Sequence, residues 1–329
     1  MPNQAGVSTG QTGRLGYFGA ACGADQPNGK DHAQSDAGKR REDQIMMIGK
    51  HREAVVENIR IAAKEEDFYR KVEVDDPVLS AEQSKAITDR FLADRKKFSH
   101  RFKSFFVRKF ANIGSSIVNR RLEIVGEELL PDLSGGAILT SNHFGPLENT
   151  LLRHLVRRHG KKRLNVVSQV TNFAMTGPIG WLMNYADTIP LSQDLRYLTK
   201  DFIAVLQELT EQKEVILIYP EQEMWFNYRK PRPLKRGAYH FAARLKAPIV
   251  SCFVEMRDTQ EEENEQFYKV KYRLHILGTL YPDENLTVKA CSEALCEQDY
   301  RLKKAAYERI YGKKLTYDFE KSDIAGWKA

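Results

Sequence analysis

From Gly136 onward, short runs of β-branched and other apolar residues alternate with stretches of helical periodicity. Six runs predict strands, at residues 137–141, 164–169, 186–191, 215–219, 249–255 and 268–277. Helical patterns occur between or after them, at residues 147–159, 195–212, 234–245 and 288–311. Strands separated by helices of this length are typical of βαβ units. The pattern therefore predicts an α/β fold with a mostly parallel central sheet flanked by helices.

Composition and periodicity divide the chain into four expected regions. They are a disordered leader (1–44), a basic and aromatic helical segment that associates with a membrane (45–125), the α/β domain (126–312) and a weakly ordered tail (313–329). The leader is rich in Gly, Asn, Gln, Asp and Ser, which cannot form an apolar core. The helical segment contains two helical stretches, 45–72 and 80–121, separated by a turn signal at residues 75–77. Ser80 followed by Gln83 has the pattern of a capping box at the start of the second stretch.

Residues 90–121 combine many cations with regularly spaced phenylalanines. Spacings of seven, four, three and one place five rings in one stripe on a helix: Phe91, Phe98, Phe102, Phe105 and Phe106. A helix with cations on one side and phenylalanine on the other can lie in a bilayer interface. Candidate membrane-associating residues are therefore Phe98, Phe102, Phe105, Arg101 and Lys103. The alternative is that the stripe packs on the sheet as core, beneath a solvated basic face.

The charge balance and the short apolar runs limit the possible partners and the cellular location. The chain carries 51 Lys and Arg against 44 Asp and Glu, a formal net charge of +7. This excess fits an anionic lipid or a phosphorylated substrate, and no nucleic-acid-binding module accompanies it, so no nucleic-acid partner is expected. Apolar runs are far shorter than the ~18 residues of a spanning helix, and no signal-peptide pattern is present. We therefore expect peripheral association with the cytoplasmic face of a membrane.

The four cysteines show neither a C-x-x-C pattern nor metal-ligand spacing. Reduced thiols and no metal site are the expectation, because disulfides are rare in the cytosol.

The segment from Ala137 to Glu148 has the pattern of a site at the end of a strand. An apolar run ends at Ser141, so His143 is expected at the carboxyl end of a strand, where open α/β sheets place their ligands. Pro146 suits the first position of a helix, which puts Glu148 in its first turn. The carboxylate can then reach one imidazole nitrogen and leave the other free to act as a base. A structural pairing of His143 with Glu148 is the alternative.

These residues resemble the glycerolipid and lysophospholipid acyltransferases of the 1-acyl-sn-glycerol-3-phosphate acyltransferase type. That family carries Asn-His-x4-Asp after a strand, and this chain has Asn142 and His143 followed by Glu148, a His-x4-Glu variant. Further segments resemble the family's later blocks in the same order, at residues 177–181 with 186–191, 219–221, 234–238 and 247–250. The resemblance implies catalytic roles for His143 and Glu148. It implies substrate-binding roles for Asn142, Pro220, Glu221, Lys235, Arg236 and Gly237.

The chain departs from the family pattern where the family usually has two arginines. Gln193 stands where the second block usually ends with Arg, and Met224 stands where the third block has one. Such arginines would hold the phosphate of the acceptor, so the resemblance does not extend to glycerol-phosphate specificity. A nearby basic cluster can supply cations from another direction or form a solvated loop; it comprises Arg229, Lys230, Arg232, Lys235 and Arg236.

The resemblance implies an O-acyltransferase that moves a fatty acyl group from acyl-CoA or acyl-carrier protein to a hydroxyl of a lysophospholipid or related lipid. No cofactor beyond the acyl thioester is expected. A hydrolase would need a nucleophilic serine in a Gly-x-Ser-x-Gly elbow, and the sequence has none. A catalytically weak membrane-surface lipid-binding protein on the same fold is the alternative, because Glu148 and the two missing arginines are departures from the family.

Overall fold

The computed structural model describes residues 51–74 and 77–328. The predicted leader at 1–44 lies outside the described residues, and so do Cys22 and the first two residues of the predicted turn at 75–77.

Within the described residues, seven strands form one sheet in the order β1-β7-β6-β2-β5-β3-β4. Neighbouring strands are parallel except in the β6–β7 hairpin. Their bounds are β1 Glu123–Val125, β2 Ala137–Thr140, β3 Asn165–Gln169, β4 Thr188–Leu191, β5 Val215–Ile218, β6 Ile249–Glu262 and β7 Tyr268–Leu280. The predicted α/β fold with a mostly parallel sheet is confirmed. Strand β1 was not expected, because three residues give no readable alternation.

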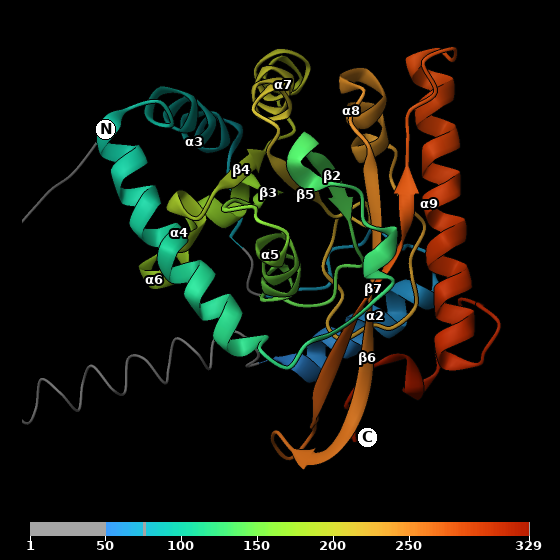
Figure 1. Cartoon of the computed structure of the whole chain (residues 1–329). Helices are drawn as coiled ribbons and strands as arrows, with labels where there is room; N and C mark the ends of the chain where they lie inside the picture. The colour runs from blue at the N-terminus through green and yellow to red at the C-terminus, as the bar shows by residue number, and fades with distance from the viewer. Residues whose placement is uncertain (1–50, 75–76, 329) are drawn as a thin grey trace, which may run out of the picture. The chain divides into compact units, whose positions relative to one another are not determined.

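Helices cover both faces of the sheet (Figure 1). Their bounds are α2 Arg52–Lys64, α3 Ala81–Asp94, α4 Phe98–Val118, α5 Asn149–Arg158, α6 Gly177–Tyr185, α7 Ile203–Glu211, α8 Gly237–Leu245 and α9 Val288–Tyr311. Successive residues of a strand point to opposite faces. Leu139 of β2 accordingly packs in a cluster with Leu155 of α5, whereas Ile138 packs in a second cluster with Leu206 of α7 and Tyr239 of α8. The central strands are buried on both faces and read as continuous apolar runs for that reason.

The second helical stretch predicted from the sequence is two helices rather than one. Ser80 and Gln83 form the predicted capping box at the start of α3. The chain then breaks after Asp94, and Lys97 has extended backbone angles as the N-cap of α4. Phe91 on α3 packs against the core, whereas Phe98 on α4 is 83% exposed. The predicted stripe is therefore divided, because the break re-aims α4 away from the core.

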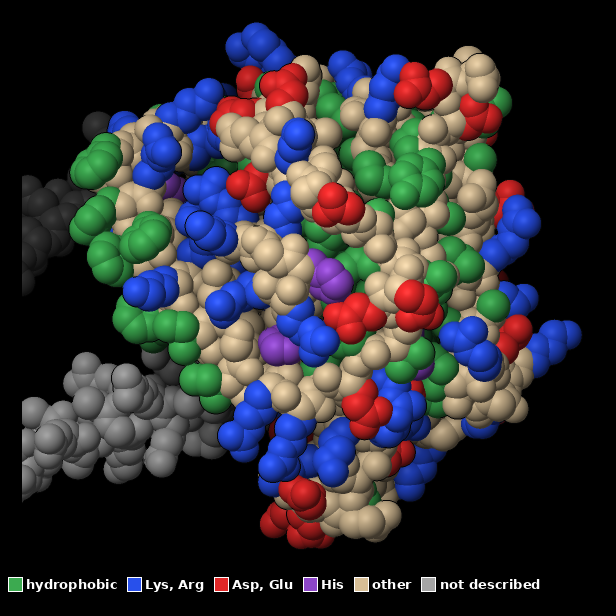
Figure 2. Space-filling model, in the orientation of Figure 1, with side chains coloured by type: hydrophobic (Ala, Val, Ile, Leu, Met, Phe, Trp, Pro, Cys, Tyr) green, Lys and Arg blue, Asp and Glu red, His purple; other side chains and the backbone are tan. Residues whose placement is uncertain are grey.

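Helix α4 presents most of its apolar side chains outward and buries only three side chains, none of them large. The buried residues of α4 are Ser104, Val107 and Ser115. Polar contacts hold it in place: Arg108 donates two hydrogen bonds to Asp187, and Asn119 bonds Thr150 on α5. Its exposed apolar residues are Phe98, Phe102, Phe105, Phe106, Phe110, Ile113, Ile117 and Val118, here called the α4 apolar face. Figure 2 shows hydrophobic side chains in a row along the edge that α4 forms in Figure 1.

The chain end differs from the weakly ordered tail that composition predicts. Ile324 and Ala325 are buried, and two isolated bridges pair Ile324 with Tyr228 and Trp327 with Phe267. The bridged residues join an apolar cluster that also contains residues of α2. The chain end contains few apolar side chains, but those of Ile324 and Trp327 pack into a cluster formed by other parts of the chain, and this is enough to order it.

No helix in the described part of the chain combines the length and the apolar character that crossing a bilayer requires.

Candidate active site

The turn that carries His143 follows the carboxyl end of β2, beside the end of β5. Thr140 of β2 is in register with Ile218 of β5, so the residues after both strands emerge at the same edge of the sheet. His143 thus lies where the sequence predicts it. Its side chain is 21% exposed, so the imidazole is reached from solvent.

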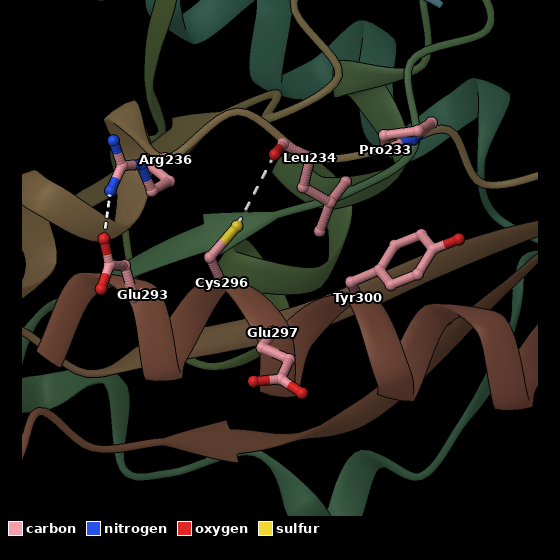
Figure 3. Close-up of a pocket in the computed structure, with 7 residues that line it drawn as sticks. All are labelled: Pro233, Leu234, Arg236, Glu293, Cys296, Glu297 and Tyr300. Carbon is pink, nitrogen blue, oxygen red and sulfur yellow. Dashed lines mark hydrogen bonds and ion pairs between the residues drawn. The ribbon is translucent and has the colours of Figure 1, made fainter. Parts of the chain in front are cut away.

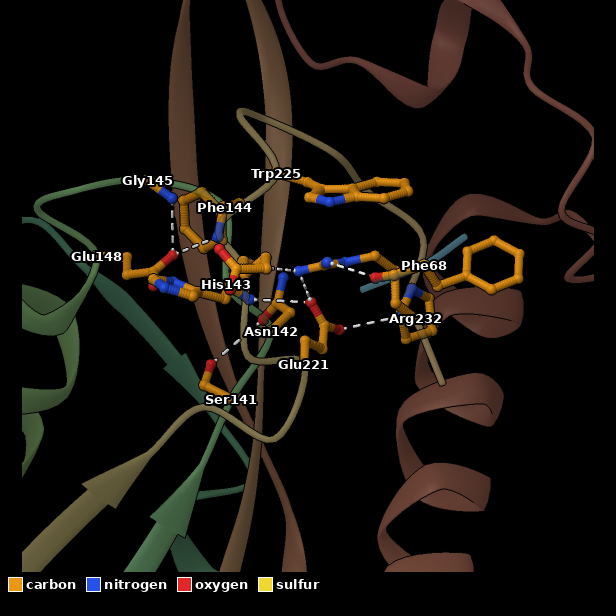
Figure 4. A network of polar contacts seen from close by, with 12 residues as sticks. Phe68, Ser141, Asn142, His143, Phe144, Gly145, Glu148, Glu221, Trp225 and Arg232 are labelled. Carbon is orange, nitrogen blue, oxygen red and sulfur yellow. Dashed lines mark hydrogen bonds and ion pairs between the residues drawn. The ribbon is translucent and has the colours of Figure 1, made fainter. Parts of the chain in front are cut away.

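Glu148 contacts the imidazole and the backbone of the turn together (Figure 4). One carboxylate oxygen accepts a hydrogen bond from Nδ1 of His143. The other accepts from the backbone N–H of Phe144, at 2.5 Å, and of Gly145, at 2.9 Å. The Glu148 side chain is only 3% exposed, so these contacts are shielded from water. A carboxylate held in this way keeps the proton of the neutral imidazole on Nδ1 and leaves Nε2, which no described residue bonds, free to accept a proton.

A second buried carboxylate holds the backbone of the same turn. Glu221 accepts a hydrogen bond from the backbone N–H of His143 at 3.2 Å. It also accepts from the Arg232 side chain at 3.0 Å and from the Arg232 backbone N–H at 3.1 Å. Arg232 is fully buried, stacks over Trp225 at 4.6 Å and donates to the carbonyl oxygen of Phe68. Burial lowers the pKa of Arg232, and Glu221 opposes that shift. The hydrogen bonds between the two residues fix the turn.

The ring of Tyr219 lies flat against the imidazole of His143. The ring centroids are 4.2 Å apart and the planes differ by 9°. Burial raises the pKa of the Tyr219 hydroxyl well above its ordinary value, and the charge of Glu148 raises it further. The hydroxyl lies near that carboxylate but makes no hydrogen bond of regular geometry with a described residue.

A buried polar network supports the end of β2 from behind. Thr140 donates to Asp299 of α9 at 2.7 Å, and Lys303 of α9 donates to Thr140 at 3.0 Å. Burial alone raises the pKa of Asp299, but Lys303 and the hydrogen bonds to the carboxylate outweigh it and the pKa is lowered. The residue three positions before His143 is therefore fixed by a charged pair inside the core.

Several residues predicted to bind substrate have hydrogen-bond partners or fixed positions within the protein. The amide of Asn142 is 2% exposed, donates to the carbonyl oxygen of Val254 and accepts from the Val254 N–H. Pro220 is buried and its carbonyl oxygen accepts from the Lys235 N–H. Gly237 begins α8. These residues shape the turn and the loop that follows β5.

The basic cluster after the third block is engaged within the molecule. Arg229 pairs with Asp258, Lys230 with Asp323 and Arg232 with Glu221. The ammonium group of Lys235 lies 3.5 Å from the ring centroid of Tyr69, and Arg236 pairs with Glu293. The solvated-loop alternative does not describe this cluster, since two of its members are almost fully buried.

Arg236 lines a groove between the segment before α8 and helix α9 (Figure 3). Leu234, Cys296 and Tyr300 form part of its wall, and the thiol of Cys296 contacts the carbonyl oxygen of Leu234. Neither His143 nor Glu148 lines this groove. Arg236 therefore lines a groove to which the His143–Glu148 pair does not contribute.

The sequence reasoning missed the partners that reach the turn from distant segments. The sequence places Tyr219 in a strand and in a family block without indicating a role, although the ends of adjacent parallel strands are expected to meet. The pairing of Glu221 with Arg232 has no readable signal, since the two residues lie eleven positions apart in a loop. No group of three His, Cys, Asp or Glu side chains in the described part of the chain is arranged as a metal site.

A comparison with protein-family models agrees with the resemblance that the motifs carry. Residues 121–255, less than half of the chain, match the family model described as Acyltransferase. No curated protein matches the chain. A solved structure to which the chain is similar is the 1-acyl-sn-glycerophosphate (LPA) acyltransferase PlsC from Thermotoga maritima. It is 16% identical, with a TM-score of 0.47, over 70% of this chain and 90% of that chain. The region that matches the Acyltransferase model contains His143, Glu148, Tyr219 and Glu221.

Proposed function

We propose that the protein transfers a fatty acyl group from an acyl thioester to a hydroxyl of a lysophospholipid or related lipid. The donor is acyl-CoA or acyl-carrier protein. Its thioester is already activated, so the proposed reaction uses it as co-substrate and needs no separate cofactor. The observation that supports the proposal most is the His143–Glu148 pair, in which a buried and doubly anchored carboxylate holds Nδ1 while Nε2 is free.

In the proposed mechanism the acceptor hydroxyl donates a hydrogen bond to Nε2 of His143. The imidazole takes the proton as the hydroxyl oxygen attacks the thioester carbonyl, and the resulting imidazolium is stabilised by Glu148. Collapse of the tetrahedral intermediate breaks the C–S bond, and the leaving thiolate takes the proton back. General-base assistance of this kind is typically worth ~10²–10⁴ in rate.

Glu221 has a different role in this proposal from the substrate-positioning role that the resemblance implies. Its carboxylate is 2% exposed and is bonded to the His143 backbone and to Arg232. We assign it to holding the turn, so that the imidazole stays at a fixed distance from the acceptor.

We also propose that the protein works at a membrane surface through the α4 apolar face. Phe98, Phe102 and Phe105 are 83%, 56% and 54% exposed, although a phenylalanine in a globular protein is usually buried. Arg101 and Lys103 are exposed beside them, so rings can enter the acyl boundary while cations meet anionic headgroups.

The test is thiol release by the purified full chain, offered acyl-CoA and a panel of lysolipids on vesicles. Release that depends on the acceptor and disappears in His143→Ala supports the enzyme. Mass spectrometry of the lipid product identifies the bond formed.

The engaged basic cluster favours one alternative, a lipid-binding protein on the same fold with little turnover. All five cations already contact a carboxylate or an aromatic ring of the protein, which leaves fewer groups to bind a charged acceptor. Binding of lysolipid without thiol release from any donor would support this alternative and contradict the proposed acyltransferase.

A further inference from the structure

We infer that Tyr219 is a positioning residue whose ring holds the plane of the His143 imidazole and stabilises the imidazolium that forms during acyl transfer. The inference rests on the proposed function of His143 as a base. It assigns Tyr219 a role in that reaction, through its contact with the imidazole rather than with substrate.

The geometry carries the first step of the argument. Glu148 fixes one edge of the imidazole through Nδ1, but a single hydrogen bond still allows the ring to tilt about the Cβ–Cγ bond. A parallel ring at 4.2 Å, with 9° between the planes, removes that rotation because the imidazole cannot tilt without losing the stack. Nε2 is then directed along one line in the plane of the ring, as base catalysis requires.

Electrostatics carries the second step. The face of an aromatic ring is negative, and a cation over it is stabilised by about 0.5–2 kcal/mol, more where water is excluded. The imidazole is neutral before the reaction and cationic after it has taken the acceptor proton. Tyr219 therefore stabilises the charged state more than the neutral one, as Glu148 does from the edge of the ring.

The hydroxyl of Tyr219 is not needed for either effect. It is buried without a hydrogen bond of regular geometry and lies near the Glu148 carboxylate. An unsatisfied buried polar group is a cost rather than a gain. The ring alone is expected to carry the role, and phenylalanine should substitute for tyrosine.

Two variants separate these contributions. Tyr219→Phe keeps the stack, and Tyr219→Leu removes the aromatic face while still filling part of the space. Turnover and KM are measured in the thiol-release assay from pH 5 to 9. Titration of the imidazole is followed by NMR, with His143→Gln used to assign its signal. The charged or titratable groups that contact His143 are Glu148, Glu221 and Tyr219 itself, and the first two are unchanged in both variants.

We expect Tyr219→Leu to lower kcat about three- to thirtyfold with little change in KM. Because the imidazolium loses a stabilising contact, its titration midpoint and the acidic limb of the pH–rate profile should both move to lower pH. Tyr219→Phe should restore kcat and both midpoints. Unchanged kcat and midpoints in Tyr219→Leu would overturn the inference, and so would a loss in Tyr219→Phe as large as that in Tyr219→Leu.

A fluorinated series covers the case in which Tyr219→Leu does not fold. Replacing Tyr219 by phenylalanine, trifluorophenylalanine and pentafluorophenylalanine preserves the shape while it removes the negative face of the ring. A stepwise fall of the imidazole midpoint along the series supports the inference, and a constant midpoint contradicts it. This titration needs no turnover. If the wild-type protein releases no thiol, the proposed function is refuted. The titration still tests whether Tyr219 stabilises the imidazolium of His143.

Discussion

At the scale of single residues, the length of Glu148 explains how the His-x4-Glu variant is accommodated. One oxygen reaches Nδ1 of His143 while the other accepts from the N–H groups of Phe144 and Gly145. The extra methylene, compared with the aspartate of the resembled family, is taken up inside the turn. Sequence spacing predicted that the two side chains meet, but not that the carboxylate also caps the turn, because that depends on backbone angles.

Glu148→Gln should abolish most turnover and leave the fold intact. The amide oxygen can still accept from the backbone N–H groups, but its NH2 group meets Nδ1 and favours the imidazole tautomer protonated on Nε2, which cannot act as a base. We expect kcat to fall about 100-fold or more, with a change of only a few degrees in the thermal midpoint. Glu223→Gln is the matched control, since Glu223 lies in the same loop as Glu221 and bonds Gln169 rather than His143. Equal turnover in the two variants would remove Glu148 from the mechanism.

Gln222 has a backbone conformation that favours glycine. Its φ is +66°, in the left-handed region, and its side chain is exposed. A side chain with a Cβ destabilises the folded state there by roughly 1–2 kcal/mol. Glycine regains only part of this free energy, because it gives the unfolded chain more conformational entropy. Gln222→Gly should therefore raise the free energy of unfolding in urea by about 0.5–1 kcal/mol, whereas Gln222→Ala, which keeps the Cβ, should not. If both variants have the same stability, φ at this position carries no strain.

At the scale of elements, periodicity predicted the regular helices and strands well and their irregular ends poorly. Helix α9 has the predicted bounds, since its periodicity continues without interruption from Val288 to Tyr311. The break between α3 and α4 was missed because residues 95–97 contain neither proline nor glycine. Tertiary packing decides it: Phe91 is drawn to the core while α4 is held by Arg108.

Removing the anchor of α4 should loosen that helix without unfolding the sheet. Arg108 is 12% exposed and Asp187 is 7% exposed, and only a longer contact with Arg163 would remain for the carboxylate. Breaking a buried ion pair lowers the free energy of unfolding by roughly 3–5 kcal/mol. Because Asp187 keeps its contact with Arg163, we expect the loss in Arg108→Ala to lie near the lower end of this range. Hydrogen–deuterium exchange should increase in peptides of α4 and stay constant in peptides of α9. Lys109→Ala, at an exposed neighbouring position, should change neither; equal exchange in both variants would show that Arg108 does not hold the helix.

The β6–β7 hairpin contains a buried histidine that should make stability depend on pH. Nε2 of His275 bonds Glu255 at 2.7 Å, and burial lowers the pKa of His275 from 6.5, opposed by Glu255. Below about pH 6.5 the unfolded chain binds a proton at this histidine, whereas the folded chain binds it only at lower pH. The free energy of unfolding therefore falls as the pH drops below about 6.5. His275→Gln keeps a donor to Glu255 and should flatten the decrease in unfolding free energy between pH 6.5 and 5. Curves of identical slope would exclude His275 as a source, leaving the other histidines whose pKa burial lowers, His100 and His154.

At the scale of the whole molecule, the site is assembled from segments far apart in the chain. Arg232 and Trp225 bond the carbonyl oxygens of Phe68 and Arg70, and Asn227 bonds Ala325 near the chain end. The His143–Glu148 pair was predictable because both residues belong to one local turn. The contacts that hold the turn were not, since each joins loops whose proximity depends on the complete fold.

Helix α4 is held on the domain by the contacts of Arg108 with Asp187 and of Asn119 with Thr150, none of which involves the α4 apolar face. Membrane binding should therefore depend on the side chains of that face alone. Two phenylalanines that leave an acyl boundary lose up to about 1.5–3 kcal/mol each. Phe102→Ser with Phe105→Ser should therefore lower the affinity for anionic vesicles at least tenfold in a flotation assay. Leu195→Ser with Tyr281→Ser is the matched control, because both residues are exposed apolar side chains outside α4, at 76% and 67%.

The two double variants give opposite results if the α4 apolar face is the contact. Since Phe102 and Phe105 are exposed, their replacement should leave the thermal midpoint almost unchanged, and thiol release from a water-soluble acceptor should persist while release with vesicle-bound acceptors falls. Undiminished vesicle binding by the Phe102→Ser, Phe105→Ser protein would refute the membrane role. Equal loss in the control would mean that exposed apolar area anywhere on the protein, rather than one oriented helix, drives the association.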